Sequence, residues 1–229
     1  MKLYSTVYEA AEAEQIIEKS RFIAYVSPAE TKEEADAFIA SIKKKHKDAT
    51  HNVPAMVIGD KFQIQWASDD GEPQGTSGAP MVQMLVKEGI TNVAVVVTRY
   101  FGGIKLGTGG LVRAYTSSAK LGLEAAGICD IEEMCVQTWD VDYTHLAKIQ
   151  NMAGTPGVNG GFSIEEIRYT DVVSLDLACV PEDAEGVISQ LTNVTAGRGT
   201  LKTQESRLVK RLIRKKVKFI ISLEFLILS

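Results

Sequence analysis

The sequence predicts an α+β protein built from two small two-layer domains. An apolar run at residues 93–97 leads through a glycine-rich segment into a helical pattern that ends at Gly127. Beyond Gly127 the strand and helix patterns follow the order βαββαβ, which is typical of a ferredoxin-like α-β sandwich. The length of 229 residues, 45% of them hydrophobic, suffices for two separate cores.

The composition limits the classes of function. A formal net charge of -4 argues against DNA as a partner, and any RNA binding must come from a local cationic patch. The cysteines are odd in number and form no C-x-x-C motif, which predicts reduced thiols in a cytoplasmic protein. The polar amino terminus predicts no signal peptide. Three histidines without a ligand spacing predict no metal site, and no cofactor motif is present.

The first domain is expected to span residues 1–127. Its patterns predict strands at 14–18, 21–27, 51–58 and 62–67 and a short helix that begins near Pro80. Thr31 and Glu34 form a capping box before a helix with one apolar face. That helix ends in lysines at 43–47, which we interpret as a solvated helix end rather than as a basic patch.

The segment from Val95 to Tyr115 has the most unusual composition. It reads as a buried strand, a glycine-rich loop and a helix expected to start at Gly110, the layout in which backbone N–H groups face a bound anion. Its glycines and its polar or cationic residues are Gly102, Gly103, Gly107, Gly109, Gly110, Arg99, Tyr100, Lys105 and Arg113. The spacing matches neither a P-loop nor a dinucleotide fingerprint. It indicates either a site for phosphate, RNA backbone or carboxylate, or glycines that only permit close packing.

A second polar loop covers residues 68–80 and contains Asp69, Asp70, Gly71, Glu72 and Thr76. Its carboxylates could hold a hard cation or act as acid and base, although they do not match a calcium loop. The favoured alternative is that they cap turns and neutralise arginines of the glycine-rich segment. We predict that Arg99 and Lys105 face the same concavity as Asp69 or Asp70.

The second domain is expected to span residues 128–207. Its patterns predict strands at 131–141, 162–168 and 172–180, helices at 143–152 and 182–191, and a last strand that begins near Thr200. We expect residues 1–127 to fold without this half. Residues 208–229 form a basic-apolar tail whose apolar end, FIISLEFLILS, is too short to span a bilayer. A surface helix, an RNA-binding tail and a strand extension all remain open for it.

The stretches DDGEPQGTSGAP and VTRYFGGIKLGTGGLVRAY, with KSRFIA at 19–24 and ATHN at 49–52, resemble the YigZ-type family. The first domain of that family is shared with the eukaryotic IMPACT proteins. The resemblance covers roughly residues 15–205. It implies a first domain like domain 2 of a small-subunit ribosomal protein and a second like the last domain of elongation factor G. Many relatives have a cysteine and an aromatic residue where this chain has Val53-Pro54, so no nucleophilic cysteine is expected there.

The resemblance implies a cytoplasmic context in translational control. We therefore favour a non-enzymatic regulatory protein that binds RNA, the ribosome or an anionic protein partner through the glycine-rich cationic loop. The first alternative is a hydrolase-type enzyme that acts on a small phosphorylated or amide substrate with Asp69, Asp70 and Glu72. The second is a pure protein-interaction module. No membrane partner is expected.

Overall fold

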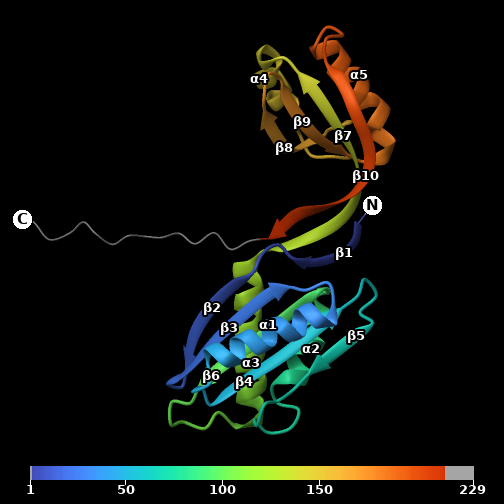
Figure 1. Cartoon of the computed structure of the whole chain (residues 1–229). Helices are drawn as coiled ribbons and strands as arrows, with labels where there is room; N and C mark the ends of the chain where they lie inside the picture. Colours follow the sequence, from blue (N-terminus) through green and yellow to red (C-terminus); the bar gives the residue numbers. More distant parts are fainter. Residues whose placement is uncertain (1, 215–229) are drawn as a thin grey trace, which may run out of the picture. The chain divides into compact units, whose positions relative to one another are not determined.

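The structure is a computed structural model that describes residues 2–214. Its contacts divide the chain into two compact units: Tyr4–Asp130 forms the first, and Ile131–Arg211 forms the second together with the start of the chain. The elements are β1 (Lys2–Val7), β2 (Ala11–Ile17), β3 (Ser20–Pro28), α1 (Lys32–Lys45), β4 (His51–Ile58), β5 (Ile64–Ala67), α2 (Gly78–Lys87), β6 (Val93–Tyr100), α3 (Gly107–Ala126), β7 (Ile128–Val141), α4 (Tyr143–Met152), β8 (Ser163–Tyr169), β9 (Val173–Cys179), the 3-10 helix η1 (Pro181–Asp183), α5 (Ala184–Val194) and β10 (Thr200–Arg214) (Figure 1). The expected mixed α/β organisation in two parts is confirmed.

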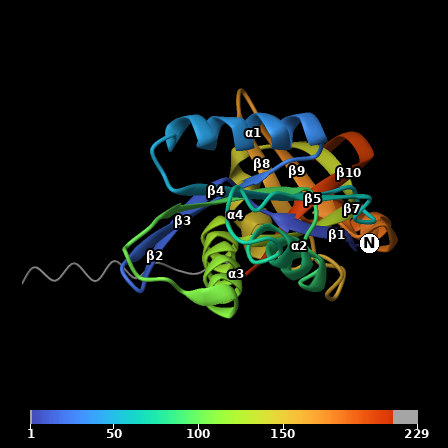
Figure 2. The ribbon, with the colours of Figure 1, turned by 90° about the horizontal axis from the view of Figure 1, so that it is seen from below.

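The first unit has an antiparallel sheet in the order β2-β3-β6-β4-β5. Strand β6 lies at its centre and is buried from Val93 to Arg99, which confirms the prediction of a strand buried on both faces. Helix α1 covers one face, and α2 and α3 cover the other (Figure 2). The unit thus has three layers, and the expectation of two layers is wrong. The reason is that successive residues of β3, such as Phe22 and Ile23, are apolar on opposite faces of the sheet.

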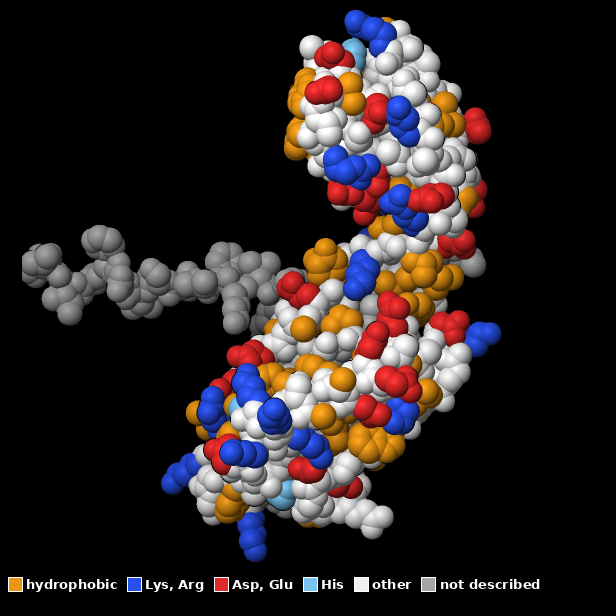
Figure 3. Space-filling model, in the orientation of Figure 1, with side chains coloured by type: hydrophobic (Ala, Val, Ile, Leu, Met, Phe, Trp, Pro, Cys, Tyr) orange, Lys and Arg blue, Asp and Glu red, His pale blue; other side chains and the backbone are white. Residues whose placement is uncertain are grey.

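Helix α1 begins as the capping box predicts. The Thr31 hydroxyl accepts a hydrogen bond from the Glu34 backbone N–H at 3.2 Å. At the other end, Lys43 pairs with Asp70, and the Lys45 ammonium lies 4.5 Å from the Tyr25 ring centroid. Basic side chains gather on this part of the first unit (Figure 3). The lysine run is therefore partly held by contacts rather than wholly solvated.

Strands β2 and β3 are joined by a two-residue turn, because Ile17 pairs with Ser20. The two turn residues, Glu18 and Lys19, have φ angles of 45° and 62°. Two-residue hairpins need this left-handed backbone to match the strand twist, and Asn-Gly adopts it most easily. A residue with a bulky side chain is strained in that conformation by about 1–2 kcal/mol.

Replacing Glu18-Lys19 by Asn-Gly is expected to raise the free energy of unfolding by about 1–2 kcal/mol, because it relieves this strain. Urea denaturation measures the change. The matched control is Glu18→Ala with Lys19→Ala, which removes the same charges but keeps both β-carbons. The control should not stabilise the protein, and equal gains in the two variants would contradict the strain argument.

The second unit contains the expected βαββαβ order, from β7 to β10. Its strands follow the order β7-β9-β8, and β10 also pairs with β7. Trp139, Phe162 and Leu175 lie in its core. The last strand begins at Thr200 as predicted but continues to Arg214, so the predicted boundary at 207 falls inside β10. The start of the predicted tail is therefore a strand extension, and residues 215–229 lie outside the described residues.

All three cysteines, Cys129, Cys135 and Cys179, are free and buried. Burial raises the pKa of Cys179 to about 12. The thiolate is the reactive form of cysteine, so this side chain is inert at neutral pH.

Asp176 is the buried charge of the second unit, only 3% exposed. It accepts hydrogen bonds from Arg168 at 2.7 Å, Thr138 at 2.8 Å and Arg207 at 2.9 Å. The bond from Arg168 lowers the pKa of Asp176 most, burial opposes it, and Thr138 and Arg207 add to the lowering, so that the pKa lies at about 2.

A carboxyl whose pKa is lowered by folding stabilises the folded state above its unfolded pKa, and this stabilisation is lost as the pH falls through the folded pKa. We expect the stability advantage of the natural chain over Asp176→Asn to shrink by about 2 kcal/mol between pH 4 and pH 2. Urea denaturation at several pH values measures this change. The exposed Asp171→Asn variant controls for net charge, and an equal pH effect in both variants would contradict the assignment.

Candidate functional site

The glycine-rich segment divides between a loop and a helix. Strand β6 ends at Tyr100, and α3 begins at Gly107 rather than at the expected Gly110. Gly102 and Gly103 therefore lie in the loop, whereas Gly107, Gly109 and Gly110 lie in the first turn of α3. The residue before the helix, Leu106, supplies no side-chain cap. The leading N–H groups of a 20-residue helix are thus left to other acceptors.

Asp69 organises the acidic loop. Its carboxylate accepts hydrogen bonds from the backbone N–H groups of Gly75, Ser77 and Gly78 at 2.7, 3.1 and 2.9 Å, and from the Ser77 hydroxyl at 2.6 Å. Burial raises the pKa of Asp69, but these bonds together outweigh it and lower that pKa. Asp69 therefore holds the loop against the start of α2. Thr76 is bound within the same loop, where its hydroxyl donates to the Pro73 carbonyl at 2.6 Å.

Asp70 connects the loop to α1 and β4. One carboxylate oxygen lies 2.7 Å from Lys43 Nζ, and the other accepts from the Asn52 N–H at 2.6 Å. Its carbonyl lies 2.8 Å from His51 Nδ1. Both carboxylate oxygens are thus occupied inside the protein. Asp69 and Asp70 therefore serve the structure of the loop, which is the alternative that we favoured for these acids from the sequence.

Glu72 and Arg99 form a buried ion pair. Arg99 Nη1 lies 2.6 Å from Glu72 Oε1, and the two side chains are only 6% and 4% exposed. The Tyr115 hydroxyl donates to the same oxygen at 2.7 Å. Burial, and then this bond to Glu72, raises the pKa of Tyr115. The charge of Arg99 is therefore neutralised within the protein. This agrees with the expectation that the acids of the second loop neutralise arginines of the glycine-rich segment.

Aromatic rings enclose the Arg99 guanidinium. Its central carbon lies 5.3 Å from the ring centroids of both Phe22 and Phe101. Arg99 Nη2 donates to the Ser20 hydroxyl at 3.3 Å. Arg99 Nε is buried and has no hydrogen-bond partner among residues 2–214. One buried donor is thus left unsatisfied.

Two pockets lie on either side of Lys105 and Leu106. The aromatic pocket, of about 360 Å³, is lined by Glu72, Pro73, Arg99, Phe101, Lys105 and the start of α3. The cationic pocket, of about 430 Å³, is lined by Glu18, Ile104, Lys105, Gly110, Arg113 and Ser117. The two loops lie at the same end of the first unit (Figure 1). They share a concavity as predicted, but the acid that faces Arg99 and Lys105 there is Glu72 instead of Asp69 or Asp70.

Other predicted residues lie elsewhere. Tyr100 points to the opposite face of the sheet, where its hydroxyl lies 2.9 Å from His46 Nδ1. It therefore does not line either pocket, whereas Phe101 is 46% exposed and lines the aromatic pocket. Gly71 has a φ of 89° and serves the turn. Sequence reasoning missed Glu18 and Ser117, because neither lies in a glycine-rich segment.

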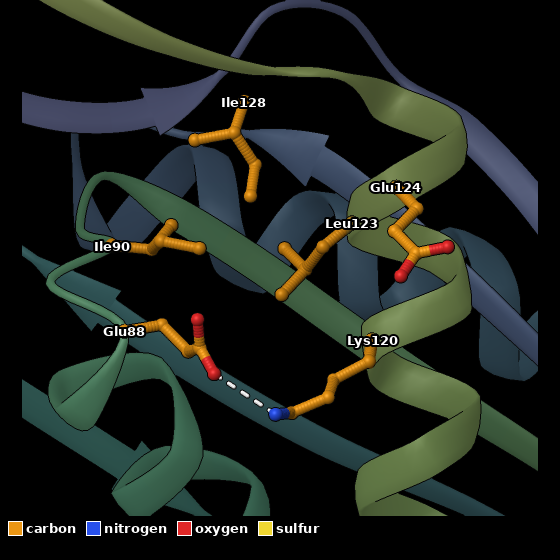
Figure 4. A pocket seen from close by; sticks show the side chains of 6 residues that line it. All are labelled: Glu88, Ile90, Lys120, Leu123, Glu124 and Ile128. Carbon is orange, nitrogen blue, oxygen red and sulfur yellow. Dashed lines mark hydrogen bonds and ion pairs between the residues drawn. The ribbon is translucent and has the colours of Figure 1, made fainter. Parts of the chain in front are cut away.

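A third, smaller pocket lies at the other end of α3 (Figure 4). Its volume is about 100 Å³, and Ile90, Leu123 and Ile128 form its apolar side. Lys120 Nζ lies 2.9 Å from Glu88 Oε1 at its rim. The pocket is too small for an organic ligand. Within residues 2–214 no three acidic, histidine or cysteine side chains come together as metal ligands, and no helix is long and apolar enough to cross a membrane.

Comparisons with known proteins place both units. The model of the Impact N-terminal domain matches residues 18–123, and that of a domain of unknown function, DUF1949, matches residues 140–198. The protein YvyE of Bacillus subtilis, named an IMPACT family member, is 41% identical over 210 residues, which cover 92% of this chain and 95% of YvyE. The chain belongs to the IMPACT family. The expectation from the sequence motifs is thereby confirmed.

Other IMPACT family members match less of the chain. YigZ of Escherichia coli is 39% identical over 140 residues, which cover 60% of this chain and 69% of YigZ. Protein IMPACT of Mus musculus is 36% identical over 94 residues, 39% of this chain and 29% of that protein. A crystal structure of a hypothetical protein is 31% identical with a TM-score of 0.54, and the match covers 90% of this chain and 98% of the other. All the predicted site residues lie within the Impact N-terminal match.

Proposed function

We propose that this IMPACT family protein is a non-enzymatic, translation-associated regulatory protein of the cytoplasm that holds a phosphate of RNA in the cationic pocket. The observation that carries the proposal is the placement of Lys105 and Arg113 at the uncapped end of α3. Both side chains are exposed, and neither forms an ion pair with another residue between 2 and 214. Cations beside free backbone N–H groups suit a phosphate group. The translational context rests on the family resemblance.

The hydrolase alternative receives less support. Hydrogen bonds inside the protein occupy the carboxylates of Asp69 and Asp70. Glu72 is held by Arg99 and Tyr115. These three acids therefore lack the freedom to position a metal or a water opposite the loop.

We also propose a specific fold type for each of the two units. The strand order β10-β7-β9-β8 with the element order βαββαβ supports a ferredoxin-like second unit. The likeness of the first unit to domain 2 of a small-subunit ribosomal protein rests on the family resemblance. Both assignments agree with a protein that works beside the ribosome.

The proposal predicts how RNA binding depends on salt. Each phosphate neutralised on a single strand contributes about -0.7 to the slope of log K against log[salt]. Three cations of the loop predict about -2, but Arg99 is neutralised by Glu72, so the expected contribution of Lys105 and Arg113 is about -1.4. Lys105→Ala should make the slope shallower by about 0.7. Fluorescence anisotropy with a labelled nine-residue oligouridylate measures it.

Differences between variants are the informative quantity, because the basic residues near the carboxyl terminus also attract RNA. The matched control is Lys87→Ala, which removes the same charge from the exposed end of α2. Its slope should equal that of the natural chain. If Lys105→Ala and Arg113→Ala both behave like the control, the cationic pocket does not bind RNA and a protein partner becomes the better candidate.

A further inference from the structure

We propose that the aromatic pocket binds a guanine base of the RNA strand whose phosphate lies in the cationic pocket. This inference rests on the proposed function. The two pockets share Lys105 and Leu106, so they are immediate neighbours. In a nucleotide the phosphate and the base are likewise separated only by a ribose. A cationic pocket beside an aromatic one therefore fits one nucleotide better than two unrelated ligands.

The rim of the aromatic pocket suits a planar ligand. It is largely apolar, with Pro73, Phe101, Leu106 and Leu111. The Phe101 ring is 46% exposed and is backed by the Arg99 guanidinium. Exposed aromatic side chains of this kind stack on the bases of single strands. The volume of about 360 Å³ lies in the range of small-molecule sites and is ample for a base.

The polar groups that line this pocket distinguish between bases. Glu72 Oε1 is occupied by Arg99 and Tyr115. Glu72 Oε2 accepts no hydrogen bond from the described residues, and His51 Nε2 lies 3.8 Å from it. Arg99 Nε is buried without a partner in the same described part of the chain. The pocket thus offers one carboxylate acceptor that the described residues leave unused, whereas the buried Arg99 Nε is closed to a ligand.

Guanine matches this acceptor better than the other bases do. It carries two adjacent donors, N1–H and the N2 amino group, which can both point at the free Glu72 Oε2. Adenine and cytosine place a ring acceptor beside their amino group, and uracil places its single donor between two carbonyls. Each of these would face the Glu72 carboxylate with a lone pair.

Glu72 also argues against an anionic group in this pocket. A phosphate, or the terminal carboxylate of a peptide, would lie against a carboxylate already buried from water. The anion is therefore expected in the cationic pocket, where Lys105 and Arg113 outnumber the single acid Glu18. The uncharged part of the ligand then enters the aromatic pocket.

The test compares nine-residue oligouridylates that carry guanine, adenine, inosine or uracil at the central position, by fluorescence anisotropy with the full chain. We expect the guanine strand to bind about tenfold or more tightly than the adenine and uracil strands. Inosine, which lacks the N2 amino group, should lose much of this preference. The inosine strand tests the assignment without any change to the protein.

Protein variants supply the second arm. Glu72→Gln keeps an acceptor for Arg99 and Tyr115 but presents an amide to the base, so the guanine-to-adenine ratio should fall toward one. Phe101→Ala, at an exposed position, should weaken the guanine strand by about tenfold through lost stacking. Arg113→Ala should weaken all four strands equally and keep the guanine preference. Thermal melting confirms that each variant is folded.

The outcomes separate the two proposals. Binding of all four strands with equal affinity, weakened by Arg113→Ala, overturns the guanine pocket and leaves the phosphate site in place; equal binding that Arg113→Ala does not weaken overturns both. Absence of binding by any strand at low salt overturns both. Displacement of the oligonucleotide by a short peptide with a free carboxyl terminus, without a guanine preference, overturns the base assignment in favour of a protein ligand.

Discussion

Replacing Glu72 by Ala is expected to lower the free energy of unfolding by about 3–5 kcal/mol. The variant leaves the Arg99 guanidinium buried between two rings, and within residues 2–214 its one remaining hydrogen-bond partner is the Ser20 hydroxyl at 3.3 Å. An uncompensated charge in that position loses its hydration without gaining a counter-ion. Tyr115 loses its acceptor at the same time. Urea denaturation of the natural chain and the variant measures the loss.

The matched control removes both charges. Glu72→Leu combined with Arg99→Met fills similar volume with apolar atoms, so it should be less destabilised than Glu72→Ala. The difference isolates the cost of the orphaned charge. A loss below about 1 kcal/mol for Glu72→Ala would contradict the buried pair, since it would mean that water reaches Arg99. Arg99 would then again be a candidate to bind phosphate.

The sequence predicted the elements better than their layers. The apolar run at 93–97 and the stop at Gly127 located β6 and α3 because burial and helix termination are local signals. The same apolar run already indicated three layers, because a strand that is buried on both faces needs another layer of structure on each face of its sheet. The sequence alone does not locate these covers, because periodicity along a helix does not say which face of a sheet the helix packs on.

For the site, the sequence could predict only on which face of the sheet a strand residue lies, because side chains alternate between the two faces along a strand. Arg99 and Tyr100 are neighbours in a strand, so a period of two places them on opposite faces, and the structure shows this separation. The choice among Asp69, Asp70 and Glu72 as the partner of Arg99 depends on the turn between them. That turn uses φ angles of 48° at Asp70 and 89° at Gly71, and no periodic signal describes such a backbone.

Gly102 contacts the β2–β3 turn so closely that no other residue fits there. A β-carbon at this position would lie 2.0 Å from both the carbonyl carbon and the carbonyl oxygen of Lys19. The Gly102 N–H donates to the Ser20 hydroxyl at 3.2 Å, and Ser20 in turn accepts from Arg99. The glycine thus joins the turn, the loop and the buried ion pair. Because the neighbouring atoms are backbone, no change of rotamer relieves the overlap.

We therefore expect Gly102→Ala to lower the free energy of unfolding by about 3 kcal/mol or more, the upper end of the cost of overpacking. The matched control is Gly109→Ala in the first turn of α3, where a β-carbon has ordinary contact with Arg113 Nη1, at 3.6 Å. The control should gain up to about 1 kcal/mol, because alanine favours the helix. Urea denaturation of both variants measures the contrast. Equal stabilities would mean that the loop and the turn do not touch, and the cationic pocket would then lose the wall that Ile17 and Glu18 provide.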